Sequence, residues 1–239
     1  MQKANLTQKL WERLSPAQAR ALAALLDLAA DAPLYLVGGA VRDLALGLPS
    51  IDLDLVLEGD APALAAALAA ALDARVVAHR RFGTASLRGR DFHLDLATAR
   101  AESYPRPGAL PVVRPATIAE DLARRDFTIN AMALGLAGPR RGELLDPHGG
   151  MADLQAGLVR VLHEGSFRDD PTRILRAARY AARLSFRIEE KTLAWLHRDL
   201  PYLDAISGAR LRQELLRCLR EERPEDVLLV LSEMGVLRR

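Results

Sequence analysis

The chain has 239 residues, half of them hydrophobic, and its formal net charge at pH 7 is +2. This length suits one large domain or two small ones, and the hydrophobic content excludes a disordered chain. A single cysteine, Cys218, excludes an internal disulfide and agrees with a reducing compartment. The longest apolar run, 61–72, is too short to span a bilayer, and the N-terminus lacks an apolar signal core. We therefore expect a soluble, cytoplasmic protein.

The first part of the chain predicts alternating helices and strands. Ser15 and Pro16 are typical of a helix start, and the Asp-Ala-Pro sequence at 31–33 ends that helix. The apolar run 126–136 is compatible with a helix or a strand. Helices are predicted at 16–30, 41–46, 61–72 and 118–125, and strands at 34–37, 51–57, 75–78, 84–88 and 92–96.

The rest of the chain differs in character. Residues 101–118 contain four prolines and little periodicity, so we expect a loop there. From Met151 onward helices dominate and no strand pair is predicted. The sequence therefore predicts an α+β domain over 1–150 and an all-helical domain over 151–239. Residues 160–223 carry 14 Arg and Lys against 10 Asp and Glu, which fits an anionic partner, a composition bias or a heat-adapted surface.

Two carboxylates alternate with leucines in the predicted strand 51–57. Residues two apart in a strand share a face, so Asp52 and Asp54 point to one side while Leu53 and Leu55 face the core. Adjacent carboxylates repel unless a cation lies between them, and Mg²⁺ commonly binds one or two carboxylates together with substrate phosphates. Two solvated aspartates on an edge strand are the alternative, which this pattern favours when it is taken alone.

A glycine pair precedes this strand. Gly38 and Gly39 separate the strand 34–37 from a helix start, where backbone approaches a ligand closely and helix amides favour phosphate. Arg42, one turn later, is placed to reach a triphosphate oxygen. With Asp43 these residues form Gly-Gly-x-x-Arg-Asp. This pattern followed by an Asp-x-Asp strand is much more specific than either half.

Three segments resemble, in order, the motifs of one family. Residues 36–56 resemble the opening motif of the class II tRNA nucleotidyltransferases and the related bacterial poly(A) polymerases. Residues 124–130 resemble the family's RRDFTxNA motif, and residues 169–179 its EDxxR helix. The resemblance extends from about residue 33 to residue 215. It implies a polymerase-β-like nucleotidyltransferase head, a small mixed sheet with helices, followed by an all-α neck.

The third motif lies on a predicted helix with a basic face. One arc, about a third of the circumference wide, collects Arg173, Arg176, Arg179, Arg183 and Arg187. These arginines lack acidic partners at i+4 before Lys191, which favours an anion as their partner over an ordinary solvated face.

In the family, the residues at the positions of Asp170 and Arg173 pair with the incoming base. A carboxylate accepts from the exocyclic amine of cytosine or adenine, and arginine donates to the ring acceptors. Guanine and uracil present an N–H where cytosine and adenine present an acceptor. The resemblance therefore implies selection of CTP and ATP without a nucleic-acid template, with Arg176 and Arg179 holding nucleotide or phosphate.

The second motif and a neighbouring strand supply further candidates. Arg124 and Arg125 end the predicted helix 118–125, where basic residues commonly cap a helix. The resemblance implies that they contact nucleotide, with Asp126 and Asn130 as polar support. The fold often supplies a third catalytic carboxylate from a neighbouring strand, and Asp95 is the candidate, with a structural role as the alternative.

The reaction that these motifs imply is metal-assisted nucleotidyl transfer. A two-metal Mg²⁺ site at Asp52 and Asp54 would serve the addition of C, A or both to a tRNA 3′ end, with release of pyrophosphate. The implied partners are the tRNA 3′ end, CTP and ATP, and no membrane. Poly(A) polymerase and a non-catalytic RNA-binding module of the same fold are the alternatives. The sequence gives no indication of the oligomeric state.

The chain departs from the family at two places. Asp169 stands where the family usually has Glu, which shortens one side chain of the third motif. Family members usually continue into body and tail domains that grip tRNA, whereas this chain stops shortly after the neck, so the resemblance leaves tRNA affinity and specificity open. Residues 104–111 occupy the place of a flexible loop linked in the family to switching from C to A. They do not indicate whether this chain adds CC, A or CCA.

Overall fold

The structure, a computed structural model, describes residues 6–49 and 52–238. The chain divides into two compact units. The first comprises the residues up to Ala101, Val113–Arg125 and Asn130–His148. The second comprises Glu102–Val112, Asp126–Ile129 and the residues from Gly149 onward. A linear division at residue 150 therefore misses two short segments that belong with the second unit.

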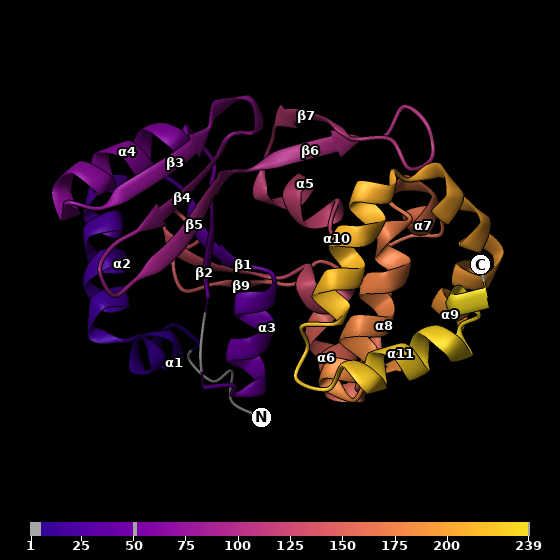
Figure 1. Cartoon of the computed structure of the whole chain (residues 1–239). Coiled ribbons are helices and arrows are strands. Elements are labelled where there is room, and N and C mark those ends of the chain that lie inside the picture. The colour runs from indigo at the N-terminus through magenta and orange to yellow at the C-terminus, as the bar shows by residue number, and fades with distance from the viewer. Residues whose placement is uncertain (1–5, 50–51, 239) are drawn as a thin grey trace. The chain divides into compact units, whose positions relative to one another are not determined.

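The first unit is built on a mixed sheet whose described strands follow the order β3-β4-β5-β2-β1-β8-β9 (Figure 1). β2 and β5 are parallel, and the other neighbours are antiparallel. The strands are β1 (Leu34–Val37), β2 (Leu53–Leu57), β3 (Arg75–His79), β4 (Thr84–Arg88), β5 (His93–Thr98), β8 (Ala133–Ala137) and β9 (Leu144–Leu145). The predicted strands at 34–37 and 84–88 are confirmed to the residue.

The helices of this unit begin where the sequence supplies caps. Ser15 caps α2 in a capping box with Gln18, and Pro16 is its first residue. The Asp60 side chain accepts from the Ala63 amide at the start of α4, which occupies the predicted 61–72. The helices are α1 (Leu6–Arg13), α2 (Pro16–Ala29), α3 (Gly39–Leu46), α4 (Ala61–Leu72) and α5 (Ile118–Ala123).

The ambiguous run 126–136 divides into two elements. A short 3₁₀ turn, Thr128–Asn130, precedes β8, and every residue of β8 is buried. A strand buried on both faces has no alternating pattern and cannot be distinguished from a buried helix by periodicity. The structure therefore resolves what the apolar pattern left open.

The prediction of a loop over 101–118 is wrong at both ends. β6 (Arg100–Ser103) and β7 (Val112–Pro115) form a separate two-stranded sheet. Proline is tolerated at strand ends and on edge strands, so Pro115 does not prevent pairing. β6 is largely half-buried and β7 largely exposed, and neither carries hydrophobic alternation, which is why the pattern missed them.

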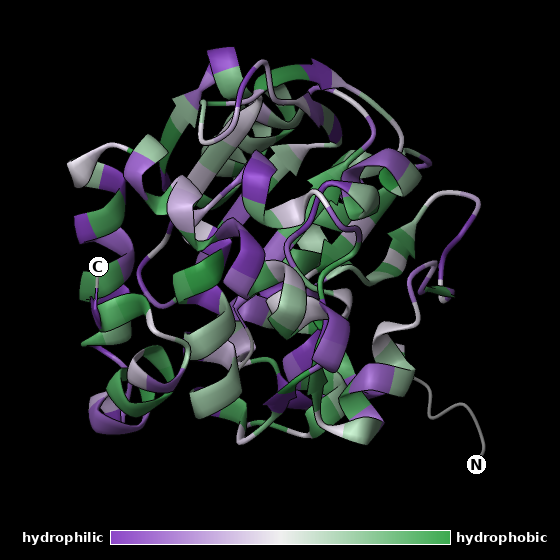
Figure 2. Ribbon diagram, turned by 90° about the vertical axis from the view of Figure 1, so that its right-hand side faces the viewer, coloured by the Kyte–Doolittle hydropathy of each residue, from purple (hydrophilic) through white to green (hydrophobic). Residues whose placement is uncertain are grey.

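The second unit is mainly helical, and its helices show both hydrophilic and hydrophobic stretches in Figure 2. The prediction of no strand pair after Met151 is wrong, because β10 (Leu158–Val159) pairs in parallel with β11 (Arg187–Ile188). Two-residue strands are too short to show alternation. The helices are α6 (Gly150–Ala156), α7 (Ser166–Asp169), α8 (Thr172–Leu184), α9 (Glu190–Asp199), α10 (Gly208–Cys218) and α11 (Pro224–Glu233).

The helix α8 packs against α10 and α11. Its residues Ile174, Leu175 and Ala178 are fully buried. Across the described residues, no helix has the length and apolar character needed to cross a membrane.

Candidate active site

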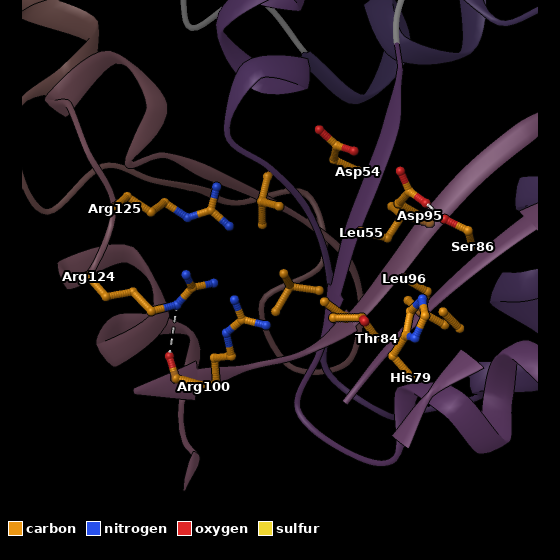
Figure 3. Close-up of a pocket in the computed structure, with 14 residues that line it drawn as sticks. Asp54, Leu55, His79, Thr84, Ser86, Asp95, Leu96, Arg100, Arg124 and Arg125 are labelled. Atoms are coloured by element: carbon orange, nitrogen blue, oxygen red, sulfur yellow. Dashed lines mark hydrogen bonds between the residues drawn. The ribbon is translucent and has the colours of Figure 1, made fainter. Parts of the chain in front are cut away.

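Two carboxylates lie side by side on adjacent strands of the first unit. Asp54 of β2 and Asp95 of β5 are partners in the parallel register, so their side chains share a face of the sheet. The Ser86 hydroxyl of β4 donates a hydrogen bond to Asp95 (Figure 3). Leu53 and Leu55 point to the opposite face and are each 2% exposed, as predicted.

Asp52 lies just before β2 and is exposed. The Asp54 amide donates to the Asp52 carbonyl at 3.1 Å, so the backbone turns at Leu53 and does not continue the strand. The predicted strand start at Ile51 lies outside the described residues. The structure thus pairs Asp54 more directly with Asp95 than with Asp52.

The neighbouring carboxylates change the pKa of Asp54. Burial, together with the charges of Asp95 and Asp52, raises the pKa of Asp54 to about 6, against partial relief from Arg125 and His93. Three carboxylates with their charges this close favour a cation between them. Hard oxygen donors of this kind suit Mg²⁺.

A metal at this position would need donors from outside the protein. Among the residues described, no group of three or more His, Cys, Asp or Glu side chains converges tightly enough to hold a metal alone. Mg²⁺ usually keeps several waters and binds one or two carboxylates together with substrate phosphates. Asp54 and Asp95, with Asp52 nearby, fit that open kind of site.

Three arginines face these carboxylates across a cavity of about 390 Å³. Figure 3 shows Arg100, Arg124 and Arg125 on one side of the cavity and Asp54 and Asp95 on the other. A site with carboxylates on one wall and guanidinium groups on the other can hold a cation and a polyanion together. The sequence did not single out Arg100, because it lies between the predicted strand 92–96 and the predicted loop 101–118.

Arg100, Arg124 and Arg125 together form the arginine wall of this cavity. Asp121, on α5, contacts all three, and the sequence did not predict this role. Its carboxylate is fully buried and accepts from Arg124 Nη2 at 2.8 Å and from Arg125 Nη2 at 2.9 Å. It also accepts from the Arg100 amide at 3.2 Å. Burial acts to raise the pKa of Asp121, but the guanidinium groups of Arg125 and Arg124 outweigh it and lower that pKa. The i,i+3 and i,i+4 spacing to the two arginines was the available signal.

The packing of α5 explains why Asp121 is buried. Ile118 and Leu122 of α5 pack against Val56 of β2, which shares a face of that strand with Asp54. The amide of Ile118 donates to Glu58 Oε1 at 2.6 Å, which anchors the start of the helix. The arginine wall is therefore fixed to the same sheet that carries the carboxylates.

The glycine pair lies between β1 and α3. Gly38 has φ +64°, a conformation that disfavours residues with a Cβ, and a Cβ there would lie 2.5 Å from Arg125 Nη1. Arg42 is 2% exposed and donates to Asn130 Oδ1 at 2.6 Å and to Asp43 Oδ1 at 2.8 Å. The Arg42 guanidinium therefore holds Asn130 and Asp43 in this structure, and its contact with a triphosphate stays a prediction.

We expect Gly38→Ala to weaken nucleotide binding, because the added methyl group displaces the Arg125 guanidinium. The positive φ should also cost about 1–2 kcal/mol of stability. Gly39→Ala is the matched control, since Gly39 lies in α3 and a Cβ there would come no closer than 3.4 Å to its nearest neighbour, Arg42 Nη2. Nucleotide titration and thermal unfolding of both variants check this. Equal effects of the two changes would contradict the role given to Gly38.

In the second unit, Asp170 and Arg173 flank the start of α8. Asp170 Oδ1 accepts from the Thr172 amide at 3.0 Å and from the Thr172 hydroxyl at 2.6 Å. Arg173 is 4% exposed and donates to Ser166 Oγ at 2.5 Å. Asp169, where the family usually has Glu, has a partly exposed side chain 3.6 Å from His163 Nε2.

The arginines of α8 are not uncompensated, and that prediction is wrong. Arg176 forms an ion pair with Asp126, and Arg179 donates to Glu221 Oε1 at 3.1 Å. These carboxylates come from other elements, so an i+4 pattern within the helix cannot reveal them. Arg183 lies 3.9 Å from Glu221 Oε2, and Arg187 belongs to β11 because α8 ends at Leu184.

Comparison with known families places two segments of the chain. Residues 34–160 match the model described as the poly A polymerase head domain. Residues 185–239 match the model described as the probable RNA and SrmB-binding site of polymerase A.

Curated relatives point the same way. The chain is 47% identical over 208 residues to the A-adding tRNA nucleotidyltransferase of Halalkalibacterium halodurans, covering 85% of this chain and 49% of that protein. It is 40% identical over 230 residues to the CC-adding tRNA nucleotidyltransferase of Deinococcus radiodurans, covering 95% of this chain and 61% of that protein. The chain thus spans less than two thirds of each.

Solved structures show the same fold. A CCA-adding enzyme in its apo form II is 41% identical, with a TM-score of 0.89 over 98% of this chain and 56% of that one. The Thermotoga maritima CCA-adding enzyme complexed with tRNA is 40% identical, with a TM-score of 0.83 over 98% and 55%. A CCA-adding enzyme complexed with ATP is 40% identical, with a TM-score of 0.86 over 98% and 55%.

Proposed function

The chain belongs to the poly A polymerase head domain family, and from that membership we propose that it transfers nucleotides from CTP, ATP or both to the 3′ end of tRNA. The observation that carries the proposal is one cavity with Asp54 and Asp95 on one wall and three arginines on the other. Nucleotidyl transfer needs both a metal-binding edge and a cationic wall for a triphosphate.

The chemistry divides between the two walls. Asp54 and Asp95, with Asp52, would hold Mg²⁺, which when bound activates the RNA 3′-hydroxyl and stabilises charge on the phosphates. Arg124 and Arg125 donate to the triphosphate and balance the charge that develops on departing pyrophosphate. Asp121 keeps both guanidinium groups in place before the substrate arrives, so the protein contributes mainly positioning.

Base selection is assigned to the second unit. Asp170 accepts from the exocyclic amine of cytosine or adenine, and Arg173 donates to a ring acceptor. Arg176 and Arg179 support this pair from α8, with Asp126 and Glu221 holding their guanidinium groups. The similar relatives are A-adding in one case and CC-adding in the other, so the acceptor that this chain extends has to be measured.

The test offers the protein and Mg²⁺ three tRNA acceptors, ending before CCA, after C and after CC. CTP, ATP, GTP and UTP are supplied singly, CTP and ATP also together, and products are resolved at single-nucleotide length. We expect uptake of CTP, ATP or both, none of GTP or UTP, and no uptake with EDTA. The tRNA acceptor that is extended identifies whether the chain adds CC, A or CCA.

Other results would redirect the assignment. Long A tracts on unrelated RNA would indicate a poly(A) polymerase. A tRNA that binds without uptake of any nucleotide would indicate an RNA-binding module and overturn the proposal. A short acceptor-stem helix at high concentration is included as substrate, because this chain spans about half of the H. halodurans relative.

A further inference from the structure

Three hydrogen bonds converge on one oxygen of the base-selecting carboxylate. Asp170 Oδ1 accepts from the amide and the hydroxyl of Thr172 and, at 2.8 Å, from Arg210 Nη2. Within the described parts of the chain, Asp170 Oδ2 has no hydrogen-bond partner. The carboxylate is therefore held by one edge and presents the other.

Arg210 is fixed from two directions. It lies near the start of α10, capped by Ser207, and its Nη1 donates to the Gly108 carbonyl at 2.7 Å. Gly108 itself has φ +70°, and its amide donates to the Arg168 carbonyl at 3.1 Å. A guanidinium group is planar and rigid, so the hydrogen bond from Nη1 to the Gly108 carbonyl limits the direction from which Nη2 can donate to Asp170.

A small cavity marks the same place. It has a volume of about 240 Å³, and residues of the selecting motif form one part of its lining while α10 forms the other. The lining residues are Asp170, Thr172, Arg176, Arg210, Gln213, Glu214 and Arg217. The contact between Arg210 and Asp170 thus lies at a pocket, where each side chain is 23% exposed.

We propose that Arg210 is a positioning residue for nucleotide selection, holding Asp170 Oδ1 so that Oδ2 alone meets the incoming base. The inference rests on the proposed function. A carboxylate that can rotate accepts from any N–H, including the ring N–H groups of uracil and guanine. A carboxylate held by one edge offers a single acceptor in a single direction, which favours the exocyclic amine of cytosine and adenine and penalises misaligned donors.

The test compares four proteins: the wild type, Arg210→Met, Arg210→Lys and Arg212→Met. Arg212 is exposed on the same helix and has no ion pair or side-chain hydrogen bond among the described residues, so it is the matched control. Binding of CTP, ATP, UTP and GTP is measured by equilibrium titration, and kcat/KM is measured for each. We expect Arg210→Met to lose roughly tenfold in preference for CTP and ATP over UTP and GTP.

The change should be a loss of discrimination more than a loss of turnover. Arg210→Lys should recover part of the preference, because it keeps a donor but not the fork, and Arg212→Met should match the wild type. In an Asp170→Asn background, Arg210→Met should cause no further loss of preference. Thermal unfolding of each variant distinguishes a loss of nucleotide preference from general destabilisation. If Arg210→Met does not fold, the comparison of Arg210→Lys with the wild type tests the inference.

Two negative results are distinguishable. A wild-type protein that binds or incorporates all four nucleotides equally overturns the proposed function, and this inference with it. A wild type that prefers CTP or ATP, alongside a folded Arg210→Met or Arg210→Lys with undiminished preference, overturns the role of Arg210 alone.

Discussion

Asp54→Asn is expected to abolish nucleotidyl transfer while making the metal-free protein more stable at neutral pH. The loss of activity should be at least about a thousandfold, because the change removes a metal-binding charge from the centre of the site. The gain in stability follows from the raised pKa of Asp54, about 6 against 3.8 for the free side chain. The wild type keeps this carboxylate ionised at pH 8 against burial and against the neighbouring charges.

The sign of the pH dependence follows from proton binding. Between pH 3.8 and about 6 the folded state holds more protons at Asp54 than the unfolded state, so stability falls as pH rises through this window. Above about pH 6 the ionised Asp54 carboxylate lowers the stability of the folded state by its full amount, at most about 3 kcal/mol. Asp54→Asn should therefore be more stable than the wild type at pH 8 in EDTA, and the difference should vanish near pH 4.

Added Mg²⁺ should reverse the order. It should stabilise the wild type, since a ligand that binds only the folded state shifts the unfolding equilibrium, and it should not stabilise Asp54→Asn. Asp91→Asn, which changes an exposed carboxylate in the turn between β4 and β5, is the control for lost negative charge. Thermal unfolding at several pH values, with EDTA and with Mg²⁺, measures each arm. An Asp54→Asn protein with more than a tenth of wild-type activity would exclude Asp54 as a metal-binding residue.

Sequence reasoning succeeded where the physics is local. The strand carrying Asp54, the glycine turn before α3 and the cap of α2 all depend on neighbours within a few residues. Alternation on β2 and β5 also placed Asp54 and Asp95 on the less buried face of their strands, with buried leucines on the opposite face. What alternation could not supply was which strands are neighbours. The register that sets Asp54 beside Asp95 is a property of the assembled sheet.

The misread charges have one cause, which is that their partners are distant in the chain. The basic face of α8 looked uncompensated because Asp126 and Glu221, which pair with Arg176 and Arg179, lie about 40–50 residues away. The hydrogen bond from Arg42 to Asn130, 88 residues away, is likewise beyond the reach of a local pattern. Counting charges within one helical turn describes the isolated helix, whereas the ion pairs of the folded protein also depend on residues that other elements bring to the helix.

Asp121→Ala is expected to be the most destabilising single change at the site. Removing one member of a buried ion pair leaves its partners uncompensated, which typically costs about 3–5 kcal/mol. Asp121 is fully buried and serves two guanidinium groups and a backbone amide, so both the fold around α5 and the arginine wall depend on it. Urea unfolding measures the loss, and Glu143→Ala, from an exposed pair with Arg140, should change little.

The pH dependence of Asp121 should run opposite to that of Asp54. Its pKa is lowered in the folded state, so the stability it contributes is present above the unfolded value of 3.8 and is lost as pH falls through the lower folded value. The stability gap between wild type and Asp121→Ala should therefore stay constant above about pH 5 and close in acid. A gap that instead widened in acid would show that Asp121 is not held ionised by the arginines.

The same variant separates folding from function. At a temperature where Asp121→Ala remains folded, released Arg124 and Arg125 side chains should raise the KM for the nucleotide, because their guanidinium groups have to be ordered again on binding. Asp121→Asn keeps the size of the side chain and part of the hydrogen bonding, so it should recover stability more than nucleotide affinity. Unchanged affinity in both folded variants would mean that the arginine wall does not contact the triphosphate, and the cationic half of the site would then have to lie elsewhere.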